Sequence, residues 1–200
     1  MNEKTACRAQ KAGSQSVAPA SHGVRLVSAA EAPPSNLAEM LMELGAGDSR
    51  FHGTSFGRGE CHLPAFLQEC QDFEKGWNLP PDKVPQSTYW LVNDRHQAVG
   101  IVRVRHRLNE SLLQHGGHIA YYIRSAERSK GYGKLALRLG LEQLRDLGAD
   151  RALLTVNPAN THSRRVVFAN GGVQDGQGAD PISGEIVDRF WIELLRPATG

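Results

Sequence analysis

The sequence predicts an α/β fold in which helices cover a mixed β-sheet. Short apolar or alternating runs are typical of strands, and they are interspersed with segments whose apolar residues recur every three or four positions, as in helices. Strands come first, then strand–helix–strand, then helix and strand. The 200 residues suffice for one core. We therefore expect one domain over 23–196, a disordered tail over 1–22, and a short tail over 197–200.

The first half of the domain contains a strand, two helices and a hairpin. The expected elements are a strand at 24–27, a helix from Ser35 stopped by Gly45 and Gly47, a glycine-rich loop at 52–60, a helix at 64–75, and strands at 88–92 and 98–107 around a turn at 93–96. Arg103, Arg105 and Arg107 alternate with apolar residues in the last strand, which predicts a hairpin with one solvated face. The same arginines also fit a site for an acidic substrate.

The second half contains the clearest helix of the chain. The expected elements are a strand at 118–124 after the flexible pair Gly116-Gly117, a helix at 133–147 with its apolar stripe at Leu137, Leu141, Leu144 and Leu147, a buried strand at 151–156, a short helix at 161–169, and a strand at 186–195. The unit 118–156 predicts a right-handed crossover between two parallel strands.

A polar loop with two glycines precedes the long helix. A helix N-terminus leaves backbone N–H groups without partners and carries partial positive charge. Arg128, Lys130 and Lys134 add full charges around Gly131 and Gly133. The pattern predicts a cradle for a phosphate or pyrophosphate group.

Other interpretations of this loop fit less well. A Walker P-loop requires Ser or Thr after Gly133-Lys134, and Leu135 stands there. A dinucleotide site requires an acidic residue after the following strand, which ends at Asn157. A helix entry with solvated basic residues remains as the purely structural alternative.

Arg128-x-x-Gly131-x-Gly133 resembles the R/Q-x-x-G-x-G/A signature of the GNAT N-acetyltransferase superfamily. The context is similar too: 119–124 resembles the fourth strand of that fold, 153–157 the fifth, and Asn160-x-x-Ser163 the start of its second motif. The resemblance covers 24–195 and is strongest over 116–172, and 106–123 is similar to a bacterial subgroup of predicted acetyltransferases.

This resemblance implies a mostly antiparallel sheet with splayed fourth and fifth strands, acetyl-CoA as co-substrate and no metal. It implies transfer of the acetyl group to a primary amine of a small molecule, or of a peptide, by direct attack in a ternary complex. The alternative is a non-catalytic acyl-CoA-binding sensor or regulatory module. We expect a cytoplasmic protein without nucleic-acid or membrane partners, and a homodimer is left open.

The resemblance also implies the site residues. Those expected at the cofactor are Tyr122, Ile123, Arg128, Ser129, Lys130, Gly131, Tyr132, Gly133, Lys134, Asn157, Asn160 and Ser163. Asn160 can equally cap the helix at 161–169. The resemblance implies an acceptor pocket built from variable loops, here 48–62 and 76–87.

The catalytic groups are less sharply defined. The proton donor that many members place seven residues after the asparagine is replaced by Val167. Either the CoA thiolate, a good leaving group, departs without a dedicated acid, or Tyr121, Tyr122 or Tyr132 substitutes. Candidate bases are His118, Glu110 and His115, and the alternative for His118 is a strand-end histidine bonded to backbone.

Composition excludes several classes of protein. A formal charge of +2 does not indicate a nucleic-acid partner, and no apolar run reaches the roughly 20 residues of a membrane span. Cys7, Cys61 and Cys70 show no spacing typical of disulfides or zinc, so we expect reduced thiols. Residues 1–22 lack the apolar stretch of a secretory signal, although their composition also fits a weak organelle transit peptide.

Overall fold

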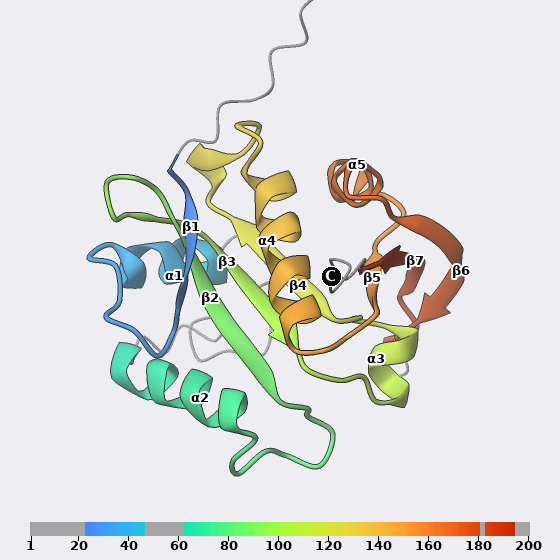
Figure 1. Cartoon of the computed structure of the whole chain (residues 1–200), viewed down its shortest axis with the longest axis horizontal. Helices are drawn as coiled ribbons and strands as arrows, with labels where there is room; N and C mark the ends of the chain where they lie inside the picture. Colours follow the sequence, from blue (N-terminus) through green and yellow to red (C-terminus); the bar gives the residue numbers. More distant parts are fainter. Residues whose placement is uncertain (1–22, 47–61, 181–182, 195–200) are drawn as a thin grey trace, which may run out of the picture.

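The computed structural model describes residues 23–46, 62–180 and 183–194 and shows helices packed on two β-sheets (Figure 1). The elements are, in chain order, β1 (Arg25–Ser28), α1 (Leu37–Ala46), α2 (Leu63–Lys75), β2 (Gln86–Val92), β3 (Ala98–Arg105), α3 (Glu110–Gln114), β4 (Ile119–Ile123), the 3₁₀ turn η2 (Ser125–Glu127), α4 (Tyr132–Asp146), β5 (Arg151–Val156), α5 (Thr161–Ala169), β6 (Val173–Ala179) and β7 (Ile186–Glu193). The expected α/β fold, with helices covering β-sheet, is confirmed.

The first sheet has the strand order β1-β2-β3-β4, and every neighbouring pair is antiparallel. Side chains alternate between its faces. Val102 and Val104 of β3 pack in the core that includes α4, whereas Ile101 packs in the core that includes α1 and α2. Both faces are covered, so the predicted solvated hairpin face is wrong. Arg107 alone among the three arginines is exposed, because it lies beyond the end of β3.

The second sheet has the order β5-β7-β6 and is also antiparallel. β4 and β5 belong to different sheets, so these two strands do not pair in the parallel ladder that was expected (Figure 1). The two strands meet where β4 begins: His118 N–H donates to Leu153 O at 2.7 Å. Beyond this junction β4 is an edge strand, consistent with the splayed arrangement that the resemblance implied.

Glycine is required next to this junction. Gly117 has a φ of +61°, and a Cβ there would lie 2.4 Å from Leu153 O. Gly116, with a φ of +120°, donates its N–H to Thr155 Oγ1 at 2.9 Å. The predicted flexible pair thus adopts backbone conformations that favour glycine, and it lets the chain approach β5 closely before β4 starts.

Helix α4 covers the first sheet with the predicted apolar stripe. Leu137, Leu141 and Leu144 are buried, but Leu147 is 48% exposed. Leu147 is the C-cap residue, and Gly148 follows in a left-handed conformation, so the stripe ends one turn earlier than predicted.

Other differences involve short or polar elements. Helix α1 continues through Gly45, and α3, η2 and β6 were not expected from the sequence. β6 is polar, exposed and irregular between Gln174 and Gln177, so it lacks the apolar alternation of a strand. The two tails and the loop at 52–60 lie outside the described residues, and the domain boundaries remain expectations.

Candidate functional site

The unpartnered side of β4 presents backbone donors. Hydrogen-bonded and non-hydrogen-bonded pairs alternate in an antiparallel ladder. Arg124 N–H donates to Val99 O at 3.0 Å, and Ile123 lies opposite Gly100. The N–H groups of Tyr121 and Ile123 therefore point away from β3, toward the second sheet.

The loop between β4 and α4 holds further donors. Ser129 and Gly131 have φ values of 62° and 86°, and Gly131 is the N-cap of α4. Within the described part of the chain, no acceptor receives a hydrogen bond from the N–H groups of residues 129–134. A Cβ on Gly131 would meet nothing within 4 Å, so the loop is open on that side. Free donors at the N-terminus of a long helix fit a phosphate group.

Three exposed cations surround these donors. Arg128 Nε donates to Ile123 O at 3.3 Å, which directs this side chain back toward β4. Lys130 Nζ lies 3.0 Å from Glu127 Oε2, and Lys134 lies in the first turn of α4. The loop therefore combines helix-end donors with full positive charge, as predicted.

Ion pairs fix the start of the loop to α1. Arg124 reaches Glu43 at 2.7 Å and Glu39 at 2.5 Å, and Ser125 N–H donates to Glu43 Oε1 at 2.8 Å. Burial raises the pKa of Glu43, but the hydrogen bonds from Ser125 and Arg124 outweigh it and leave the pKa below its usual value. The carboxylate is therefore ionised and holds the chain where it leaves β4.

Helix α5 brings a second N-terminus from β5. Asn160 is its N-cap and accepts from Ser163 N–H at 3.0 Å, so the structural alternative for this residue is present. Asn157 directly follows β5, accepts from Ala159 N–H at 2.9 Å, and donates to Glu185 at 2.8 Å. These polar residues stand opposite β4 and α4, on the side of the second sheet.

The Tyr121 side chain lies between α4 and α5. Its hydroxyl is buried without a hydrogen bond of normal geometry. Burial raises the pKa of this phenol, while the nearby Ser163 lowers it by a smaller amount. A Cβ on Gly133 would lie 3.6 Å from the Tyr121 ring and 3.4 Å from Val166. A polar atom without a partner at this boundary fits a ligand that passes between the helices.

His118 is built into the junction of the two sheets. Its Nδ1 accepts from Leu153 N–H at 2.9 Å, its backbone N–H donates to Leu153 O, and its carbonyl accepts from Arg105 N–H. Burial, and then the charge of Arg105, lower its pKa to about 4. The Nδ1 lone pair is occupied, so this geometry favours the structural alternative over a proton-accepting role.

The other candidate bases lie at the two ends of α3. Glu110 is the first residue of the helix and is exposed. His115 is its C-cap, and its Nδ1 lies 3.3 Å from Asp180 Oδ2. Neither is brought to the loop at 129–134.

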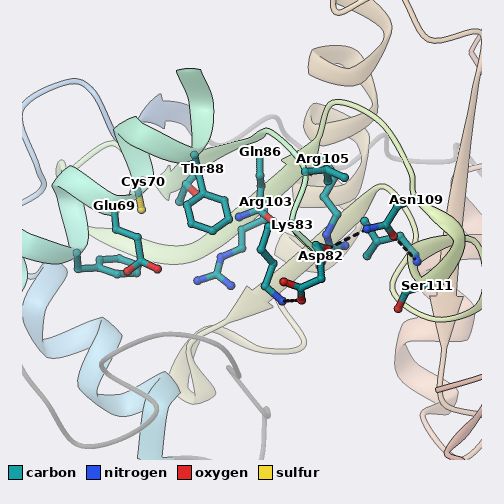
Figure 2. Close-up of a pocket in the computed structure, with 14 residues that line it drawn as sticks. Glu69, Cys70, Asp82, Lys83, Gln86, Thr88, Arg103, Arg105, Asn109 and Ser111 are labelled. Atoms are coloured by element: carbon teal, nitrogen blue, oxygen red, sulfur yellow. Dashed lines mark hydrogen bonds and ion pairs between the residues drawn. The ribbon is translucent and has the colours of Figure 1, made fainter. Parts of the chain in front are cut away.

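A cavity of about 230 Å³ lies on the other face of the first sheet (Figure 2). Its lining includes residues from the predicted acceptor loop 76–87, namely Asp82, Lys83, Val84 and Gln86, and the two arginines Arg103 and Arg105. The remaining lining residues come from α2, β2 and the segment around α3, and their contribution was not predicted. Cys70 of α2 is a free buried thiol whose pKa burial raises to about 11, so it is neutral there.

A sequence model described as the acetyltransferase (GNAT) domain matches residues 48–173, more than half of the chain. The chain belongs to the GNAT acetyltransferase family. It is therefore an acetyltransferase that uses acetyl-CoA, as the sequence predicted.

Solved GNAT structures share the fold. The ribosomal-protein-S5-alanine acetyltransferase from Vibrio fischeri is 18% identical with a TM-score of 0.60, covering 87% of this chain and 94% of its own. A chimera of the Vibrio cholerae spermidine N-acetyltransferase is 13% identical with a TM-score of 0.60, covering 86% and 96%. A putative acetyltransferase from Salmonella typhimurium, solved with acetyl-CoA, is 13% identical with a TM-score of 0.56, covering 88% and 95%. A search of curated protein sequences found no match.

In this GNAT chain the position of the usual proton donor faces the core. Val167 is 1% exposed, and Gly172 approaches it so closely that a Cβ would lie 2.3 Å from Val167 Cγ1. Phe168 is half exposed and packs edge-on against Phe190 at 5.3 Å. A tyrosine at 167 would not fit this packing, so residue 167 does not donate the proton.

The described residues show neither a metal-binding cluster nor a membrane-spanning helix. No group of three or more His, Cys, Asp and Glu side chains is arranged there to hold a metal ion. None of the helices in the same ranges has the length and apolar character needed to cross a membrane.

Proposed function

We propose that this GNAT protein transfers the acetyl group of acetyl-CoA to the primary amine of a small molecule, by direct attack in a ternary complex. The observation that carries the proposal is the set of N–H groups at residues 129–134, which have no acceptor among the described residues and lie beside the edge of β4. It combines a phosphate cradle with a strand edge along which an extended cofactor arm can lie.

A small acceptor is favoured by the size of the cavity. The similar structures include an enzyme named for a ribosomal protein and one named for spermidine, so the fold accommodates both kinds of acceptor. The volume of about 230 Å³ is below the ~300–1,000 Å³ of pockets that hold drug-sized ligands. We therefore place a small amine there.

The cofactor is held by the loop and by α5. The N–H groups of 129–134, with the charges of Arg128, Lys130 and Lys134, bind the pyrophosphate. Asn157, Asn160 and Ser163 face the pantetheine arm from the second sheet. Bound acetyl-CoA supplies the acetyl group as an activated thioester.

The end of β4 orients and polarises this acetyl group. Ile123 N–H points from the unpartnered side of the strand and can donate to the thioester carbonyl oxygen. The neighbouring Tyr122 packs on the opposite face, in the core shared with α1 and α2, which is the face of the cavity. We assign the Tyr122 hydroxyl the role of proton donor to the leaving sulfur.

His118 and Glu110 take different roles in this proposal. His118 positions β4 relative to β5 through both of its bonds to Leu153. Glu110 is exposed at the start of α3, and we propose that it draws cationic amines toward the cavity.

The test is acetyl-CoA binding by calorimetry, followed by CoA thiol release with a panel of small amines. Arg128→Gln should weaken acetyl-CoA binding by roughly tenfold, because it removes a charge from the cradle. Arg138→Gln is the matched control, since Arg138 is exposed farther along α4 and pairs with Glu142 at 2.7 Å. Gly133→Val should block binding, because the side chain would crowd Tyr121 and Val166.

The outcomes separate the alternatives. Absence of acetyl-CoA binding would reject the cradle. Binding without acetylation of any amine, small or peptidic, would favour the sensor. Acetylation of peptides alone would reject the small-molecule acceptor.

A further inference from the structure

The cavity beside β3 contains two arginines that the proposed acetyl transfer does not use. Arg103 and Arg105 both project from β3 into it (Figure 2). Arg103 lies opposite Thr88 of β2 and Ala120 of β4, so two small side chains flank it on the sheet. The two arginine side chains therefore form part of the wall of the cavity.

The cavity lies close to the reactive end of β4. Tyr122 is opposite Ile101, two residues from Arg103 on the same face of β3. Diagonal neighbours of this kind lie about 7–8 Å apart between their Cα atoms. One acceptor molecule of modest length can thus reach both Arg103 and the neighbourhood of Tyr122.

Both arginines are half-buried in the wall of the cavity, and a guanidinium group stays protonated in proteins. Arg105 Nη1 donates to Gly116 O at 3.1 Å and to Gly117 O at 2.9 Å, which fixes its side chain. Burial first, and then the charge of Arg103, lower the pKa of Arg105 to about 10. Burial also lowers the pKa of Arg103. A desolvated guanidinium attracts an anion more strongly than one in water does.

The described lining contains two acidic side chains, Asp82 and Glu69. Asp82 pairs with Lys83 at 2.7 Å, and both side chains are more than half exposed at the rim. Glu69 of α2 acts on Arg103 and raises its pKa against the larger effect of burial. Among the lining residues that the structure describes, cations outnumber anions, and Cys70 is uncharged.

Building on the proposed N-acetyltransferase function, we propose that this cavity binds a carboxylate of the acceptor, so that the acceptor is an amino acid or a similarly small amino carboxylate. Guanidinium groups bind carboxylates through paired, charge-assisted hydrogen bonds. An acceptor with cationic groups only, such as a polyamine, would place like charges beside two half-buried arginines.

The test compares each amino acid with its own C-terminal amide, and adds spermidine as a cationic acceptor. Acetyl transfer is followed by CoA thiol release. Loss of a hydrogen bond to a charged group should lower kcat/KM by roughly 10- to 100-fold in the amide, mainly through KM. Spermidine should be a poorer acceptor than the preferred amino acid.

Variants then assign the preference to the cavity. Arg103→Gln should bring the carboxylate-to-amide ratio of kcat/KM close to one, without changing acetyl-CoA affinity. Arg103→Lys keeps the charge and should retain part of the preference for the carboxylate. It provides the measurement in place of Arg103→Gln where that variant does not fold. Arg107→Gln is the matched control, because Arg107 is exposed beyond the end of β3, and its preference should be unchanged.

The outcomes distinguish this inference from the proposed function. Equal rates for acids and amides, a clear preference for spermidine, or no acetylation of any amino carboxylate despite acetyl-CoA binding would overturn the carboxylate site. Failure to bind acetyl-CoA would overturn the proposed function itself. An unchanged acid preference in folded Arg103→Gln and Arg103→Lys would place the carboxylate elsewhere.

Discussion

At the residue scale, His118 makes the stability of the junction between the two sheets depend on pH. Its pKa is about 4 in the folded protein, lowered from 6.5 by burial and by Arg105. The unfolded chain therefore takes up a proton between pH 6.5 and 4 that the folded protein does not. The free energy of unfolding should fall as the pH falls through this window, by at most about 3 kcal/mol from this group.

Urea denaturation of the wild type and His118→Asn at several pH values between 7 and 4 tests this. An asparagine oxygen can still accept from Leu153 N–H but does not titrate. The variant should lose less stability on acidification than the wild type, while its kcat above pH 7 stays within a few-fold. Equal pH dependence of stability, or loss of the acidic limb of the rate profile, would restore His118 as a base.

The adjacent tyrosines of β4 provide a second residue-scale prediction. Tyr121→Phe removes a buried hydroxyl without a normal hydrogen bond, so the free protein should be as stable or up to ~1 kcal/mol more stable. Acetyl-CoA affinity should fall if this hydroxyl meets the cofactor. Tyr122→Phe should instead lower kcat by roughly 10²-fold. Thermal denaturation, calorimetry and kinetics of both variants, measured together, would contradict the assignment if the two patterns were exchanged.

The sequence could predict those site residues that lie next to one another in the chain. The cradle at 128–134 is one continuous loop at a helix N-terminus, so its donors and charges follow from local structure. Tertiary packing decided the rest: the sequence could not show that His118 is buried against Leu153. Nor could it show that Glu69 of α2 faces the same cavity as Arg103.

At the scale of elements, the register of β3 against β4 sets the position of the reactive backbone. A Cβ at Gly100 would lie 2.6 Å from Tyr122 O and 2.8 Å from Ile123 Cδ1. Gly100→Ala should therefore displace the end of β4, lower stability by about 1–3 kcal/mol, and reduce kcat/KM by more than about tenfold. Gly23→Ala is the control, since its Cβ would meet only Asp94 at 3.7 Å. Denaturation and steady-state kinetics check both, and a fully active Gly100→Ala enzyme would show that this register is not critical.

Elements with strong periodicity were predicted from sequence, and weak ones were not. α4 and α5 combine apolar spacing with clear start and stop signals. α3 has only five residues, and β6 pairs with β7 through an irregular, polar ladder. The arginines of β3 misled the prediction of a solvated face, because alternation shows that two faces differ but not what covers each of them.

At the scale of the whole molecule, acetyl-CoA should bridge the two sheets. The cradle lies in the connection from β4 of the first sheet to α4. Asn157, Asn160 and Ser163 lie after β5 of the second sheet, in the connection to α5 and in its first turn. Among the described strands β4 and β5 share no ladder, and hydrogen bonds join them only near His118 and Gly116. A ligand that contacts both sides therefore stabilises their relative position as well as its own loop.

This bridging has a measurable consequence for thermal stability. A ligand that binds only the folded state, at 100 times its Kd, adds about 2.7 kcal/mol. For a chain of this size that corresponds to a rise in Tm of roughly 5–10 °C. NAD should give no such rise, because no acidic residue follows β5 to bind its ribose: Asn157 stands there. Differential scanning calorimetry with saturating acetyl-CoA or NAD makes the comparison.

Hydrogen exchange should slow at the N-termini of both α4 and α5 when acetyl-CoA binds. Protection confined to α4, or stabilisation by NAD alone, would contradict a cofactor that lies between the sheets.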